Sequence, residues 1–143
     1  MVPDGIVSPR GVEQGGDMQR VWIALGSLAG LTAVAMAAQA AHGMAWLDPP
    51  ALAMMRSAIE IQGWHALALL ACGLWSPSGG RLADWAGAAF ALGIVLFCGA
   101  VYAVALSGVR LGIIAPLGGT LLMVGWLLLG LSAIVTTRSA NQI

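Results

Sequence analysis

The sequence predicts an all-α membrane protein with four transmembrane helices in an up-down-up-down bundle. Of its 143 residues, 59% are hydrophobic and only 8% are charged, against roughly 25% charged in soluble domains. Four long stretches are almost free of charge, and each is close to the roughly 20 residues that cross a hydrocarbon core. Short connections join these stretches, and short connections favour antiparallel neighbours. The expected spans are about 21–45, 51–75, 84–106 and 111–136, in one transmembrane domain of residues 20–137.

The first expected span follows a segment without apolar periodicity. Residues 1–19 are rich in glycine and charge, so we expect a flexible cytoplasmic tail there. From Val21 to Met44 the chain has no charge. Small residues recur along this stretch at alternating steps of four and three, which places one smooth stripe along a helix and lets two helices approach closely in lipid. The stripe comprises Gly26, Gly30, Ala33, Ala37 and Ala40.

The same stretch has a second interpretation, as a secretory signal peptide. Arg20 would be its basic flank, 21–37 its apolar region and Ala38-Gln39-Ala40 its cleavage site. That apolar region is long for a signal peptide, and helix packing explains the small-residue stripe better. These two points favour a retained first helix, with a cleaved one as the alternative.

The second expected span, 51–75, contains most of the polarity that the chain places near lipid. Asp48 is positioned to cap this helix, and Pro49 suits its first position. Arg56 and Glu60 must lie at or near the membrane boundary, because a charge at mid-bilayer costs about 2.5 to 3.5 kcal/mol. Since they are four residues apart on a helix, we expect them to form an ion pair there.

The third and fourth expected spans, 84–106 and 111–136, each have small residues of their own. A turn by composition, 76–81, precedes the third span. Pro116 marks either the first turn of the fourth helix or a kink near its start. Residues 138–143 form a short C-terminal tail. The small residues that we expect at helix contacts in these spans are Gly93, Gly118 and Gly125.

Arginine placement predicts the orientation in the membrane. The side that holds both termini and the second connection has more arginines than the other side, and the positive-inside rule therefore places both termini in the cytoplasm. Trp22, Trp75 and Trp85 lie near that boundary and Trp46 near the opposite one, as interfacial aromatic belts require. The arginines of the first side are Arg10, Arg20, Arg81 and Arg138, and those of the second are Arg56 and Arg110.

The polar residues of the second span fall on two helix faces. At about 100° per residue, Arg56 and Glu60 share one face, while Gln62 and His65 share another. Together with His42, these residues form the candidate polar site. Two interpretations remain open. The side chains can hydrogen-bond between helices and fix the bundle's register, or Glu60, Gln62 and His65 can line a transport path, which in so small a bundle requires an oligomer.

His42 and His65 also raise the hypothesis of a haem or metal site, because imidazole is a common metal ligand. On straight antiparallel helices the two histidines would differ by about 10 Å in depth, which is too far for one haem. The sequence has no H-x-x-x-H, no E-x-x-H and no cysteine cluster. We therefore assign no metal ligands and no cofactor, and keep haem or metal binding as a minor alternative.

Four separated segments resemble the motifs of a known family. Residues 40–44 read Ala-Ala-His-Gly-Met against G-A-H-G-L, and 62–70 are similar to Q-x-Y-H-A-L-A-L. Residues 97–102 are similar to F-S-G-S-L-Y, and 115–126 to T-P-I-G-G followed by G-W. In this order, and over about residues 25–130, they resemble the transmembrane protein 256 or YgdD-like family, domain of unknown function 423. The resemblance implies an integral membrane protein and supplies no reaction.

The sequence narrows the class of function. No nucleophile lies beside a base and no two acids lie at a usable spacing, so we expect no enzyme and assign no catalytic residue. The six basic residues balance six acids, and no basic patch indicates nucleic acid. We expect a non-catalytic structural or accessory component of the bacterial inner membrane. It would pack against a larger membrane complex, such as a respiratory enzyme, or form a homo-oligomer, with transport as the alternative.

Overall fold

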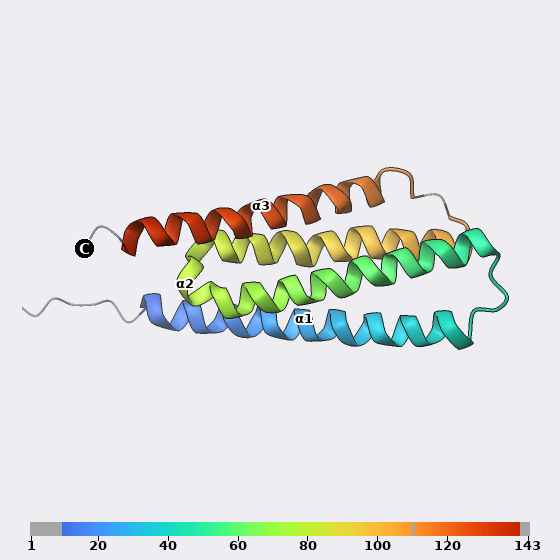
Figure 1. Cartoon of the computed structure of the whole chain (residues 1–143), viewed down its shortest axis with the longest axis horizontal. Coiled ribbons are helices and arrows are strands. Elements are labelled where there is room, and N and C mark those ends of the chain that lie inside the picture. The colour runs from blue at the N-terminus through green and yellow to red at the C-terminus, as the bar shows by residue number, and fades with distance from the viewer. Residues whose placement is uncertain (1–9, 110, 141–143) are drawn as a thin grey trace, which may run out of the picture.

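The computed structural model describes residues 10–109 and 111–140, with side chains over 16–109 and 111–136. These residues form three helices, α1 (Arg10–His42), α2 (Pro49–Ser107) and α3 (Ile114–Ala140). Figure 1 shows them as a bundle of long, nearly parallel rods. Each of the three helices is long and apolar enough to cross a membrane. The predicted all-α class is confirmed.

Helix α2 folds back on itself at Gly80 (Figure 1). Gly80 has φ 57° and ψ −150°, a backbone region that is essentially restricted to glycine. The two arms of α2, 49–79 and 81–107, run antiparallel, since Ser76 pairs with Asp84 beside the bend and Gln62 pairs with Tyr102 far from it. In the segment where a turn was predicted, 76–81, the helix continues to Gly79 and the chain reverses direction at Gly80.

The helix ends differ from the expected spans. Residues 10–19 belong to α1, although the sequence analysis placed them in the N-terminal tail, and residues 138–140 belong to α3. The expected spans ended where charge-free sequence ended, whereas a helix satisfies its own backbone and can continue past the membrane boundary. Residues 1–9 and 141–143 of the expected tails lie outside the described residues.

The predicted capping of α2 is confirmed. The Oδ1 atom of Asp48 accepts a hydrogen bond from the backbone N–H of Ala51 at 2.8 Å, and Pro49 occupies the first helical position, where its missing N–H costs nothing. At the other end of α2, Gly108 adopts the left-handed conformation with φ 67° and donates its N–H to Val104 O at 2.9 Å. Pro116 lies in the first turn of α3.

Both α1 and α3 pack against α2. Within the described residues, no Cα atom of α1 comes within 8 Å of one in α3. The two arms of α2 therefore form the middle of the bundle, and the outer helices cover them from different sides. Large side chains from every segment fill the core, including Trp22, Leu69, Phe90 and Leu122.

The small residues named from the sequence lie mostly at contacts within the chain. A Cβ atom on Gly26 would lie 2.9 Å from Ala66 O, and one on Gly118 would lie 2.8 Å from the Cα atom of Phe97. Gly93 faces the backbone of Gly118 across the same crossing of α2 and α3. Gly125 contacts the Phe90 ring, and Gly30 faces Ala66. Ala33 and Ala40 are buried, whereas Ala37 is exposed.

Candidate functional site

The Gln62 side chain joins three helical segments. It is only 4% exposed. Its Nε2 donates to Ala29 O at 2.9 Å and to Thr32 Oγ1 at 2.7 Å, both on α1. Its Oε1 accepts from Tyr102 Oη at 2.8 Å, on the second arm of α2. Both amide hydrogens and the amide oxygen are thus used in contacts between helical segments.

The His65 ring extends these connections to α3. Its Nδ1 lies 2.7 Å from Ile61 O, and its Nε2 lies 3.2 Å from the indole Nε1 of Trp126. An indole N–H can only donate, so Nε2 accepts and the ring hydrogen lies on Nδ1, where it is donated to Ile61. The ring also packs against Phe90, with centroids 5.7 Å apart. Both ring nitrogens are therefore occupied.

We call the side chains of Thr32, Gln62, His65, Tyr102 and Trp126 the polar layer. It contains at least one residue from α1, from each arm of α2 and from α3. In the described part of the chain, no buried side-chain nitrogen or oxygen lacks a hydrogen-bond partner. The hydrogen bonds of the polar layer cross-link the helical segments.

Sequence reasoning found two members of this layer and missed the others. Gln62 and His65 were singled out because polar residues inside a membrane segment are rare. Tyr102 and Trp126 were noted only as parts of the family-like motifs, and Thr32 was not singled out. The motifs did contain the signal, because all four residues of the Gln62–Tyr102 and His65–Trp126 pairs come from them.

Arg56 and Glu60 lie on the opposite side of the first arm, and both are exposed. The expected ion pair between them is absent among the contacts of the described residues. Side chains on a helix lean toward its N-terminus, so Arg56 points away from Glu60, and arginine preceding a carboxylate is the weaker order for an i, i+4 pair. The candidate polar site is therefore two separate groups, one inside and one outside.

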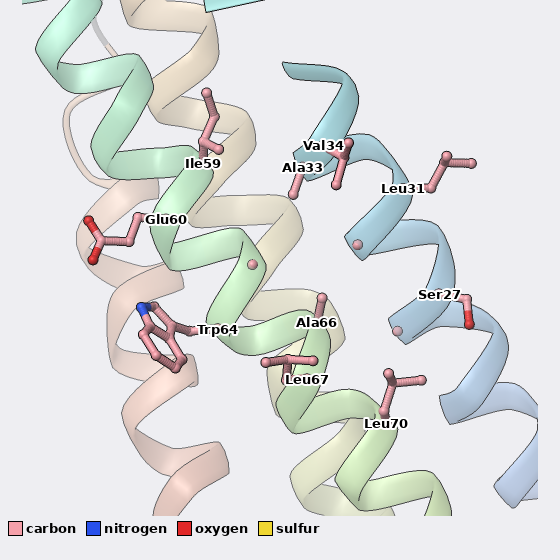
Figure 2. Close-up of a pocket in the computed structure, with 13 residues that line it drawn as sticks. Ser27, Leu31, Ala33, Val34, Ile59, Glu60, Trp64, Ala66, Leu67 and Leu70 are labelled. Carbon is pink, nitrogen blue, oxygen red and sulfur yellow. The ribbon is translucent and has the colours of Figure 1, made fainter. Parts of the chain in front are cut away.

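An open groove of about 590 Å³ lies between α1 and the first arm of α2. Gly30 and Ala33 line it from α1, and Gly63 and Leu67 from α2. Figure 2 shows the Glu60 carboxylate and the Trp64 indole at its edge, both pointing away from α1. A smaller hollow of about 210 Å³ between the same helices includes Arg56, Glu60 and Ala37. The groove is apolar inside and charged at one end.

His42 is exposed in the last turn of α1, away from this groove and from the polar layer. His65 has both nitrogens in hydrogen bonds within the protein. Among the described residues, no three His, Cys, Asp or Glu side chains come together as a metal site would require. The geometry therefore gives the haem or metal hypothesis no support.

A second set of polar contacts, which the sequence analysis missed, lies beside the bend of α2. The Oδ1 atom of Asp84 accepts from Trp22 Nε1 at 2.9 Å and from Ser76 Oγ at 2.6 Å. Trp75 Nε1 donates to Ser132 Oγ of α3 at 3.0 Å. These contacts fasten α1 and α3 to the arms of α2 at the end of the bundle where the chain reverses.

The fold and its composition define a small all-α, multi-pass membrane protein. The chain belongs to the family described as "Protein of unknown function (DUF423)", which it matches over residues 36–119. The family resemblance seen in the motifs is thus confirmed.

Relatives in two bacterial groups are similar along most of their length. The chain is 40% identical over 112 residues to a UPF0382 membrane protein of Staphylococcus epidermidis, covering 77% of the chain and 92% of that protein. It is 34% identical over 112 residues to a UPF0382 membrane protein of Haemophilus influenzae, covering 77% of the chain and 90% of that protein. No solved structure matches the chain.

Proposed function

We propose that this protein is a non-catalytic structural or accessory component of the bacterial inner membrane that acts by contact between its outer surface and another membrane protein. One observation carries the proposal. The buried polar side chains satisfy one another, whereas Arg56 and Glu60 face outward beside an apolar groove and do not pair with each other. The charged groups that do not pair with each other therefore lie on the outer surface.

The proposal includes four membrane spans. Helix α2 has 59 residues, more than twice the roughly 20 that cross a hydrocarbon core, and it folds back near its middle. With α1 and α3, its arms provide four antiparallel rods. Figure 1 places the start of α1, the bend of α2 and the end of α3 at one end of the bundle. Arg20 and Arg81 lie toward that end, which favours a cytoplasmic location for both termini.

The geometry favours contact over transport. A path along Glu60, Gln62 and His65 would need the three side chains on one surface, but Glu60 is exposed while Gln62 and His65 are buried. Gln62 and His65 are also fixed by partners on neighbouring helices. Opening a path through them would break the polar layer that joins the segments.

Photo-crosslinking in intact membranes tests this proposal. A photoreactive residue at Leu67, beside the groove, should form adducts with protein. The same residue at Leu127, which is 73% exposed on α3, should react only with lipid and serves as the matched control. Lipid adducts alone at both positions would refute a contact function. Ion or solute flux through vesicles that contain the purified protein would favour the transport alternative instead.

A further inference from the structure

The first arm of α2 leaves one narrow seam uncovered. Between residues 57 and 74, contacts with α1, with the second arm and with α3 cover the remaining positions. The uncovered positions follow one another at alternating steps of three and four, the spacing of a coiled-coil contact line. The residues of this seam are Ser57, Glu60, Trp64, Leu67, Ala71 and Leu74, all exposed.

The seam is unlike the lipid-facing surface of the same protein. On α3 the exposed positions Met123, Leu127 and Leu131 are all large and apolar, as hydrocarbon requires. The seam instead includes a serine and a carboxylate. Glu60 lies one turn, about 6 Å, further along the arm than Arg56, and it has no partner within the described chain. A cationic group from outside the chain would give this carboxylate a partner.

The surface also offers space for a second helix. A Cβ atom on Gly63 would meet nothing within 4 Å, so the backbone of the first arm is accessible there. The groove begins beside it, with Gly30 and Ala33 on its far side. Trp64, which is 60% exposed, provides a large side chain that such a groove can receive. The protruding Trp64 side chain and the groove therefore lie next to each other on one surface.

We infer that a second copy of this chain covers the seam, in a parallel dimer with its two-fold axis along the membrane normal. This inference rests on the proposed contact function and names its partner. A two-fold interface brings each residue against the same surface of its partner. The Glu60 side chains of the two copies then face each other and the Arg56 side chains of both copies flank them, so that two acidic and two basic groups meet at the interface. The pattern is self-complementary, whereas a partner of one charge would leave either residue unpaired.

Charge reversal gives the sharpest test. The chain has no lysine, so an amine-reactive dye labels only the terminal amino group, and energy transfer between labelled chains in vesicles reports dimers as lipid dilutes the protein. Arg56→Glu and Glu60→Arg should each weaken self-association about a hundredfold, because either variant places four like charges at the interface in place of two acidic and two basic groups. Mixed together, the two variants should associate with each other to within about tenfold of the native chain.

A second measurement does not depend on the charges. Leu67→Cys should form a disulfide-linked dimer on oxidation, while Leu127→Cys should not. The native Cys72 and Cys98 are both buried, so the unmodified chain supplies the background. Self-association of both charge variants as strong as that of the native chain, or no linked dimer from Leu67→Cys, would overturn the second copy as partner.

The two proposals fail in different ways. If the photoreactive residue at Leu67 captures a different membrane protein, while the charge variants do not associate, contact remains the function and the second copy is wrong. If the same residue captures only lipid, both proposals fail together.

Discussion

Replacing Gln62 with leucine should loosen the bundle by a predictable amount. The leucine side chain fills similar space but makes none of the three hydrogen bonds of Gln62 to Ala29, Thr32 and Tyr102. Interhelical hydrogen bonds in membranes contribute about 0.6 kcal/mol each. The expected loss in the free energy of unfolding is therefore roughly 2 kcal/mol for Gln62→Leu, and about 0.6 kcal/mol for Tyr102→Phe, which removes one of the three bonds.

A double-mutant cycle isolates the bond between the two side chains. In the Gln62→Leu background the Tyr102 hydroxyl has already lost its acceptor, so Tyr102→Phe should cost nothing further. Reversible unfolding in mixed micelles of increasing SDS content, followed by circular dichroism, measures each free energy. Ser107→Ala is the matched control, because its hydroxyl bonds only to Ala103 O, at 2.6 Å within the same arm.

The result that would refute this reasoning is additivity. Distant, independent substitutions add to within about 0.3 to 0.5 kcal/mol. If Tyr102→Phe costs the same with Gln62 present or absent, the two side chains do not act together and the polar layer does not hold the second arm to the first.

Three further predictions follow from the packing and the chain path. Gly118→Ala should destabilise the bundle by about 1 to 3 kcal/mol, because its methyl group would lie against the backbone of Phe97, whereas Gly130→Ala, with nothing within 4 Å, should have little effect in the same unfolding assay. Ser78→Cys at the bend should react with an impermeant thiol reagent only after the membrane is opened, and Val109→Cys should react from outside; the reverse pattern would invert the topology. The intact mass of membrane-extracted protein should include α1, and a mass lacking it would establish a cleaved signal peptide.

Sequence alone could predict the helices but not which face of each helix points inward. Asp48 and Gly80 act locally, through a cap and a permissive backbone, so their roles follow from neighbouring residues. The placement of Glu60 and Gln62 on different faces of the helix also follows from the rotation of 100° per residue. In lipid, however, the outer surface of a helix is as apolar as its core, so periodicity does not show which side is buried. Partners such as Tyr102 and Trp126 depend on that rotation.

The small-residue faces illustrate the same limit. Their contacts within the folded chain restrict where a partner can bind. The sequence predicts helix contacts at Gly26 and Gly118 but does not show whether the partner helix belongs to the same chain or to another protein. In the folded chain they bring α1 and α3 against α2, so they are already occupied. Any contact outside the chain must use what this packing leaves open. Of the four segments, the first arm is the one that contacts all the others, and between residues 57 and 74 it exposes only its seam. That seam carries Glu60, which pairs with nothing in the described chain, so a contact with another molecule there would give this carboxylate a partner.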